Sequence, residues 1–319
     1  MQVIVDLDFL VYRAGFAAET RSYDVAIELP NGAVEEKLFS PISSCAAFPD
    51  GASAGDVMKD YLAKLPDGAM VISKETVISP EPESHALHIA SEMIHNMLAA
   101  VKKEHPKANI KKPRMLLTGK RNYRYHIATI KPYKGNRDAD TRPVHYQALR
   151  AYLIKHHKAE VIEGHEADDE ACIAMWAAKP GKAILISQDK DLDQAIGHHF
   201  DPVKKVFYTV DEQEADRAFW IQVLSGDVTD NIPGCYKIGT TKAAKLVDTC
   251  ASLIWPLCVE VYQESIDKHG NQYGGLKALE AVLETARLVY MQRQPYELWL
   301  PARPFGSTKE LEEKEYAPG

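Results

Sequence analysis

The amino-acid sequence predicts an α/β fold with a mainly parallel central sheet flanked by helices, followed by a helical C-terminal part. Short β-branched runs that read as buried strands alternate with longer segments of helical apolar spacing. From about Asp211 onward the pattern is helical. Sheets of this class bind ligands at the carboxyl ends of their strands, so acidic residues there are candidate site residues.

The first elements follow from local pattern. The β-branched run Val3–Val5 ends at Asp6, as expected of a central strand that delivers a carboxylate at its tip. A helix is expected at 9–18. Residues 23–29 and 33–39 read as a β-hairpin with Asn31-Gly32 at its turn, and residues 41–54 read as a loop.

The remaining core elements continue the same alternation. Helices are expected at 83–104, 142–157 and 167–178, and strands at 114–117, 159–163 and 183–187. We therefore expect three regions: an α/β core at 1–205, which contains an insertion at about 21–82, a helical region at 206–305 and a charged, flexible tail at 306–319.

The bulk composition excludes several classes of protein. No apolar run in the 319 residues approaches the length that a bilayer requires, and the N-terminus shows no signal-type leader. The five cysteines form no C-x-x-C pair, which argues against a zinc site and a disulfide framework. We expect a cytoplasmic protein with no membrane partner.

One stretch is strongly cationic although the formal net charge of the chain is −7. Between Lys102 and Arg142 there are thirteen Lys or Arg residues and three acids, a local excess of ten positive charges. Such an excess is typical of a surface that binds a polyanion, although a plain solvated Lys-rich surface is also common.

Acidic residues form four short clusters along the chain. Asp6 ends the first strand and Asp8 lies beside it, E-A-D-D opens a helix at Glu166, S-Q-D-K-D follows a buried strand, and Asp227 and Asp230 precede a Pro-Gly turn. Carboxylates gathered at strand ends repel one another unless a cation binds them, and Mg²⁺ or Mn²⁺ prefers oxygen ligands. Taken alone, E-A-D-D is equally compatible with an ordinary acidic helix start.

The most specific segment is S-G-D-V-T-D-N-I-P-G-C-Y-K-I-G-T-T-K-A-A-K-L, from Ser225 to Leu246. Gly234 and Gly239 permit tight backbone, and the amides that follow Gly239 can face a phosphate at a helix N-terminus. A helix–turn–helix without a ligand is the alternative interpretation.

Five motifs occur in a characteristic order: V-D-L-D, Y-K-G-N-R, E-A-D-D, S-Q-D-K-D and G-D-V-T-D-N-I-P-G-C-Y-K-I-G. In this order they resemble the flap-endonuclease-like 5′-nuclease superfamily, and most of all the phage-type 5′→3′ exonucleases. The resemblance extends over most of the chain. It implies a PIN/5′-nuclease-like core, a basic arch at about 119–142 and a helix–three-turn–helix in the C-terminal part.

The resemblance also implies roles for individual residues. Two divalent cations, Mg²⁺ or Mn²⁺, would be held in two sets, one of Asp6, Glu166, Asp168 and Asp169, the other of Asp189, Asp191, Asp227 and Asp230. Lys134 would lie near the scissile phosphate, so that Lys134, Asp168 and Asp169 are the catalytic candidates. The helix–three-turn–helix would grip duplex backbone, with a K⁺ ion on its carbonyls as a further option. The candidate DNA-binding residues are Tyr12, Arg13, Arg124, Tyr133, Lys134, Arg137, Lys237, Gly239, Thr241, Lys242 and Lys245.

The sequence departs from the family pattern at the second strand. Where the family commonly carries an Asp, L-L-T-G-K offers only the Thr118 hydroxyl and Gly119. Asp8 could compensate for the missing carboxylate. The resemblance offers no role for the insertion at about 21–82.

The sequence thus predicts a two-metal, structure-selective 5′→3′ exonuclease or flap endonuclease that acts on DNA with a 5′ end, nick or flap. It would serve phage DNA replication or recombination, in the bacterial host cytoplasm if phage-encoded, as a monomer whose tail contacts a replication partner. The alternatives are a non-catalytic relative that binds forked DNA and a PIN-like ribonuclease.

Overall fold

The computed structural model describes residues 1–43, 51–137, 142–249 and 254–301. The chain forms two compact units. The core unit takes in Met1–Asn122 and Arg137–Asp211, and the helical unit takes in Tyr123–Asn136 and the chain from Glu212 onward. The tail predicted at 306–319 and residues 138–141 of the predicted arch lie outside the described residues.

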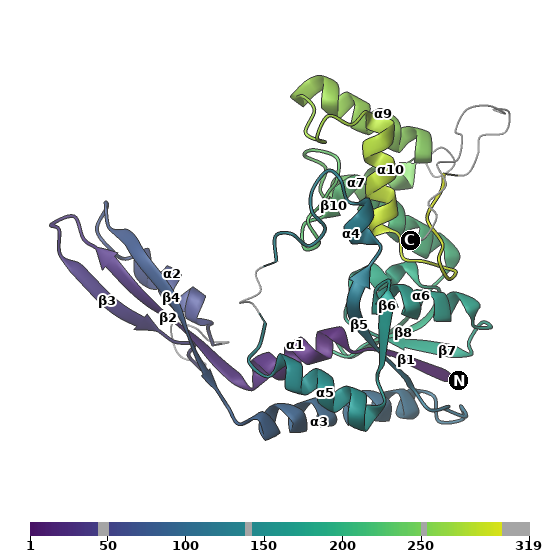
Figure 1. Ribbon diagram of the computed structural model, residues 1–319, viewed down its shortest axis with the longest axis horizontal. Helices are drawn as coiled ribbons and strands as arrows, with labels where there is room; N and C mark the ends of the chain where they lie inside the picture. Colours follow the sequence, from purple (N-terminus) through teal and green to yellow (C-terminus); the bar gives the residue numbers. More distant parts are fainter. Residues whose placement is uncertain (44–50, 138–141, 250–253, 302–319) are drawn as a thin grey trace. The chain divides into compact units, whose positions relative to one another are not determined.

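The core unit contains a six-stranded sheet in the order β6-β5-β1-β7-β8-β9 (Figure 1). All neighbouring strands are parallel except the last pair, β8 and β9. The mainly parallel sheet predicted from the sequence is therefore confirmed. The strands are β1 (Gln2–Asp6), β5 (Arg114–Asn122), β6 (Glu160–Gly164), β7 (Ala183–Ile186), β8 (Gly197–Asp201) and β9 (Val206–Val210).

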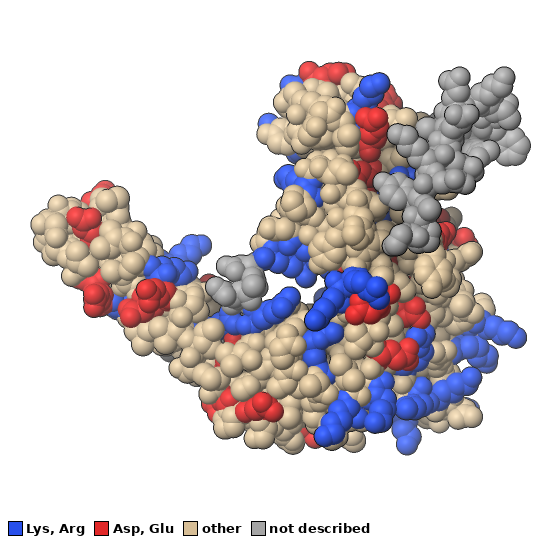
Figure 2. All heavy atoms as spheres, viewed as in Figure 1, with Lys and Arg blue, Asp and Glu red and all other residues tan. Residues whose placement is uncertain are grey.

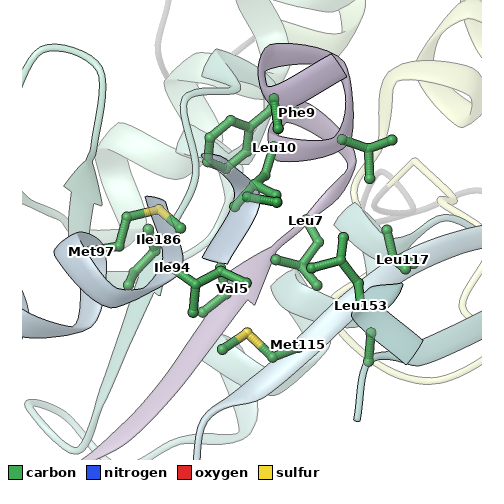
Figure 3. Packing of buried hydrophobic residues seen from close by; sticks show 14 of the residues in the cluster. Val5, Leu7, Phe9, Leu10, Ile94, Met97, Met115, Leu117, Leu153 and Ile186 are labelled. Atoms are coloured by element: carbon green, nitrogen blue, oxygen red, sulfur yellow. The ribbon is translucent and has the colours of Figure 1, made fainter. Parts of the chain in front are cut away.

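Helices cover both faces of this sheet because its central strands are apolar on both faces. Val5, Met115 and Ile186 point to the face that packs against α1 (Asp8–Ala17), α3 (Glu83–Glu104) and α5 (Tyr146–His157) (Figure 3). Neighbouring residues alternate to the other face, where α6 (Ala167–Ala177) packs. The strand register places the carboxyl ends of β1, β5 and β7 at one edge.

The insertion forms a separate three-stranded antiparallel sheet in the order β3-β2-β4. The predicted hairpin is present as β2 (Glu19–Glu28) and β3 (Val34–Phe39), and Gly32 adopts a φ of 80° in its turn. The third strand, β4 (Met70–Pro80), and helix α2 (Ala54–Leu62) were not predicted. Helix α2 packs on Val25, Ile27 and Phe39.

The helical unit is built around α7 (Glu212–Ser225), α8 (Thr240–Thr249), α9 (Ile254–His269) and α10 (Ala278–Val289). Two short strands, β10 (Gly226–Asp227) and β11 (Ile232–Pro233), pair between α7 and α8. Gly226 and Gly234 approach so closely that a Cβ on either would collide with the backbone of the other strand. None of the described helices has the length and apolar character that crossing a membrane requires.

The segment that follows β5 belongs to the helical unit. It contains the short helix α4 (Arg124–Ile127), and α10 anchors it through side chains on both partners. The Arg124 guanidinium donates to the carbonyl oxygens of Leu288 and Tyr290, at 2.8 and 2.7 Å. The Glu284 carboxylate accepts hydrogen bonds from the backbone N–H groups of Thr129 and Ile130, each at 2.8 Å.

Candidate functional site

The carboxylate of Asp6 lies at the carboxyl end of β1 and is buried. The backbone N–H of Asp8 donates to Asp6 Oδ1 at 2.9 Å, and the Ser187 hydroxyl donates to Asp6 Oδ2 at 2.9 Å. Ser187 Oγ in turn accepts a hydrogen bond from the backbone N–H of Asp189 at 3.0 Å. These bonds connect the end of β1 with the loop that follows β7, as a parallel sheet requires of neighbouring strand ends.

Several acidic residues of the core unit lie close enough to repel one another. Burial and the neighbouring Asp8 carboxylate raise the pKa of Asp6 to about 8. Burial also raises the pKa of Asp168 well above its usual range, and the charges of Asp6, Asp189, Glu166 and Asp8 raise it further. Four of the predicted ligands, from the first strand, the E-A-D-D helix and the S-Q-D-K-D loop, therefore meet in one electrostatic environment together with Asp8.

Asp8 also belongs to this cluster, because its charge acts on both Asp6 and Asp168. Strand β1 ends at Asp6 and α1 begins at Asp8, so Asp8 lies in the first turn of a helix. Asp8 Oδ2 accepts a hydrogen bond from the backbone N–H of Thr118 at 3.0 Å. Its other oxygen lies 3.3 Å from Nη1 of Arg150, which also donates to the Thr118 carbonyl at 2.7 Å.

The backbone explains why no carboxylate follows Thr118 on β5. A Cβ at Gly119 would lie 2.4 Å from the Ile162 carbonyl oxygen and 2.5 Å from the Glu163 side chain. An Asp at position 119 would therefore displace β6. The Asp8 carboxylate, bonded to the amide of Thr118, places an acid beside the position at which the sequence pattern lacked one.

The E-A-D-D motif opens α6, as predicted. Glu166 is the N-cap residue of α6. Its backbone N–H donates a hydrogen bond to the Asp169 carboxylate at 3.1 Å. The Thr118 hydroxyl accepts a hydrogen bond from the N–H of Ala167 at 3.0 Å, which fixes the start of α6 against β5. The fully buried Asp169 stabilises the helix start through this hydrogen bond, whereas Asp168 is partly exposed.

The S-Q-D-K-D loop forms a 3₁₀ turn, η2 (Lys190–Gln194). Asp189 Oδ1 caps this turn by accepting the N–H of Asp191 at 2.9 Å. Asp193, the next acid, accepts a hydrogen bond from the Tyr208 hydroxyl at 2.8 Å. Asp189 is exposed and Asp191 is partly exposed, so both can be reached by a solvated cation.

The donor chemistry of this cluster fits a hard divalent cation, since carboxylate oxygens in mutual repulsion are what such an ion neutralises. The side chains do not converge on a single point: within the described residues no group of three His, Cys, Asp or Glu has the spacing of a metal site. Asp6, Asp8, Asp168 and Asp189 are the residues of this cluster that could hold an ion.

The two acids of the helical unit have partners within that unit. Asp227 Oδ1 accepts the backbone N–H groups of Thr229 and Asp230, which shapes the loop between β10 and β11. Asp230 Oδ2 accepts a hydrogen bond from the Tyr133 hydroxyl at 2.7 Å and lies 3.6 Å from Lys134 Nζ. Lys134, with a φ of 55°, also donates its backbone N–H to the Asp230 carbonyl at 2.8 Å.

Two of the predicted DNA-binding residues, Arg124 and Tyr133, are buried in the helical unit. Arg124 is 1% exposed, and its guanidinium bonds to the end of α10, so it contributes little surface. Tyr133 is 4% exposed, and its ring packs in the core of the helical unit, so little of it is open to a base. The sequence alone gave no indication that these two side chains are buried.

The other predicted DNA-binding residues lie on the surface. Tyr12 is partly buried beside the rings of Phe16 and Tyr146, while Arg13 and Arg137 are exposed. In the helical unit the exposed residues cluster at the start of α8, where Ile238 and Ala243 point inward instead. These exposed residues are Lys237, Gly239, Thr241, Lys242 and Lys245.

Within the core unit, part of the cationic stretch is neutralised by ion pairs. Arg114 binds Glu160 and Glu170, and Arg121 binds Glu163. Lys and Arg side chains are accordingly distributed over several parts of the visible surface (Figure 2). The local charge excess therefore overstates the free positive charge.

Two curated proteins are similar to this chain. It is 35% identical over 156 residues to the flap endonuclease Xni of Shewanella pealeana, and 32% identical over 156 residues to that of Shewanella piezotolerans. The alignment covers 44% of this chain, and the chain spans 57% of the length of each relative. The resemblance inferred from the motifs is thus supported by these sequences. No family model matches the chain.

Solved structures of a phage nuclease show a partial likeness. The chain aligns with the zinc-bound T5 5′-exonuclease at a TM-score of 0.46 and 19% identity, over 62% of this chain and 80% of the other. It aligns with the T5 D15 flap endonuclease in complex with DNA and metal ions at a TM-score of 0.43 and 18% identity, over 65% and 80%.

Sequence reasoning missed the support of the acidic cluster. The Arg150 guanidinium, the backbone N–H of Thr118 and the Ser187 hydroxyl bind carboxylates of the cluster, and only Thr118 was singled out from the sequence. For Ser187 a signal existed, since it directly follows a buried strand in S-Q-D-K-D. For Arg150, in the middle of a helix, the sequence carried no signal.

Proposed function

We propose that this protein is a metal-dependent, structure-selective 5′→3′ exonuclease or flap endonuclease that hydrolyses DNA phosphodiesters. The observation that carries the proposal is the meeting of Asp6, Asp8, Asp168 and Asp189 at the carboxyl edge of a parallel sheet, where burial and mutual repulsion raise the pKa values of Asp6 and Asp168. The similarity to flap endonucleases supports the same activity.

In this proposal Mg²⁺ or Mn²⁺ is held first by the acids of the core unit. Asp6, Glu166, Asp168 and Asp169 would form one ligand set, and Asp189 and Asp191 would contribute to the other. When bound, such ions activate a water and stabilise the attacking and leaving oxygens of an in-line displacement. The protein's own residues position the carboxylates: Ser187 orients Asp6, and Arg150 orients Asp8.

Lys134 is proposed as the cation that stabilises charge on the scissile phosphate. Its ammonium group lies 3.6 Å from Asp230 and over the Tyr133 ring at 4.9 Å, so its side chain is partly ordered before substrate arrives. The segment at 119–142 is proposed to act as the arch. The exposed cations at the start of α8 are proposed to bind duplex phosphates as a helix–three-turn–helix, with K⁺ as an option.

Phosphate contacts carry no sequence information, so we propose selection by DNA shape and binding that weakens steeply with salt. The decisive experiment digests 5′-labelled duplex, nicked and flapped DNA, and matched RNA side by side, with and without Mg²⁺. Release of mononucleotides or short oligomers only with metal supports the proposal. Binding to forked DNA without any release indicates the non-catalytic relative, and preferential digestion of matched RNA indicates the ribonuclease.

Lys134→Ala provides a second test, because it separates chemistry from binding. If Lys134 stabilises developing charge, single-turnover cleavage slows by about a hundredfold while DNA affinity changes much less. Equal losses in rate and affinity would show that Lys134 only clamps a phosphate.

A further inference from the structure

The core unit contains a cavity of about 790 Å³ that the acidic cluster does not use. It is lined by α1, by the second half of α3 and by the β8–β9 hairpin. Its volume lies within the range typical of sites for small molecules. Figure 3 shows two of the lining residues, Phe9 and Met97, at the margin of the core.

The wall of this cavity offers flat aromatic surface. Phe200 and Phe207 stack with ring centroids 4.3 Å apart and an interplanar angle of 15°. Phe9 and Phe200 are buried, while Phe207 is partly exposed. Aromatic walls of this kind favour a planar apolar group, and nucleic-acid bases stack on such rings.

The same cavity gathers positive charge. Arg13, Lys103 and Lys205 all line it and are exposed, and within the described chain none of them forms an ion pair with a carboxylate. Glu104 is the only acid among the lining residues. The hairpin that carries Lys205 is ordered by Asp201, whose Oδ1 accepts the backbone N–H groups of Val203 and Lys204. An anionic group is therefore the complementary partner.

The cavity is separate from the acidic cluster but close to it. Helix α1 carries Asp8 in its first turn and Arg13 five residues later. Five residues advance an α-helix by about 7.5 Å and about 500°, which leaves the two side chains roughly 140° apart around the axis. The cavity thus opens on a different side of α1 from the one that faces Thr118 and Arg150.

We propose that this cavity binds a single deoxynucleotide, with its base against the phenylalanine rings and its phosphate at Lys103 and Lys205. The choice of a nucleotide over other planar anions rests on the proposed nuclease function. Two sources have this chemistry: a free 5′-mononucleotide released by cleavage, and an unpaired nucleotide of the bound DNA.

Calorimetry on the full chain in EDTA tests the proposal, because cleavage is then silent. The titrants are a deoxynucleoside 5′-monophosphate, the matched nucleoside and inorganic phosphate. The monophosphate is expected to bind at least tenfold more tightly than either part alone. Equal affinity for inorganic phosphate and the monophosphate would overturn the proposal, because no base would then be recognised.

Two variants locate the binding. Lys103→Ala with Lys205→Ala removes the charge, and Asn96→Trp fills the cavity from the exposed side of α3 without removing charge. Each is expected to weaken monophosphate binding at least tenfold, whereas the control, Lys102→Ala with Lys155→Ala, removes two exposed lysines outside the cavity and leaves it unchanged. Circular dichroism verifies that each variant is folded. Unchanged affinity in both cavity variants would overturn the proposal.

Fluorescence anisotropy with flapped DNA in EDTA then identifies the source. Loss of DNA affinity in Asn96→Trp assigns the cavity to an unpaired nucleotide of the substrate. Loss of mononucleotide binding alone assigns it to the released product. Because neither measurement needs cleavage, a protein that binds the monophosphate but digests no DNA would defeat the nuclease proposal and leave this one standing.

Discussion

The acids of the core unit and those of the helical unit differ in what neutralises them. Within the described residues Asp6 and Asp168 form no ion pair, and burial and neighbouring carboxylates raise the pKa of each. Asp230 instead has the Tyr133 hydroxyl and the Lys134 ammonium as partners. Asp6 and Asp168 are therefore stabilised by a proton or an external cation, whereas Asp230 is already stabilised by its own unit.

This difference separates carboxylates whose pKa is raised by burial and like charges from a carboxylate that is paired within its own unit, although both occur in similar acidic motifs. Asp169 and Asp227 show that the division also runs within motifs. Asp169 accepts the backbone N–H of Glu166 at the start of α6, and Asp227 accepts those of Thr229 and Asp230 in the loop between β10 and β11.

The largest effect is expected from Asp168→Asn, which removes one charge from the repelling cluster. DNA cleavage should fall by at least about a hundredfold, measured by single-turnover digestion of flapped DNA with Mg²⁺. In EDTA the same variant should unfold at higher urea concentration, because repulsion is relieved. Asp67→Asn, an exposed acid outside the cluster, should change neither. Full activity in Asp168→Asn would remove this residue from the site.

The pH dependence of stability should reveal Asp6 in the metal-free protein. A carboxyl group whose pKa is higher in the folded state binds its proton more tightly there, so the free energy of unfolding falls as pH rises. For Asp6 the free energy of unfolding should fall between about pH 3.8 and about pH 8, by roughly a few kcal/mol in total.

Urea denaturation in EDTA across this pH range measures that effect. Asp6→Asn should flatten the profile, and Mg²⁺ should restore stability at high pH in the unsubstituted protein. Stability that rises with pH over the same window, with or without the substitution, would contradict the proposed crowding of the acids.

Arg124→Met should destabilise the helical unit because two buried carbonyl oxygens lose their donors. The expected loss is about 2 kcal/mol in the free energy of unfolding, measured by urea denaturation. Arg121→Met is the matched control, since its exposed ion pair with Glu163 contributes little. Unchanged stability together with weaker DNA binding would return Arg124 to the DNA-binding residues.

The smallest effect should come from Asp230→Asn, which weakens a pair that is only partly buried. A loss of about 1 kcal/mol is expected in EDTA, the opposite sign to the gain from Asp168→Asn. Denaturation of both variants side by side measures the contrast. A gain in stability from both substitutions would show that the two regions do not differ as argued.

Local pattern located most of the core elements. The helix predicted at 83–104 has those bounds in the structure, and the hairpin turn at Asn31-Gly32 forms as expected. Strand β4 was missed because most of its residues are exposed, so no apolar alternation marks it. Helix α2 did carry a signal, the capping box of Ser53 and Asp56, but Ser53 was assigned to the loop predicted at 41–54 and no element was predicted over 55–62.

By itself the sequence determined the fold class and most of the acidic residues at the site, because strand periodicity and the polar residues that end each strand are local properties. Only the tertiary structure decided which of them interact. It placed Asp8 beside Thr118 and Arg150, and it buried Arg124 and Tyr133. Burial and partnership depend on residues far apart in the chain, and a local pattern contains no information about them.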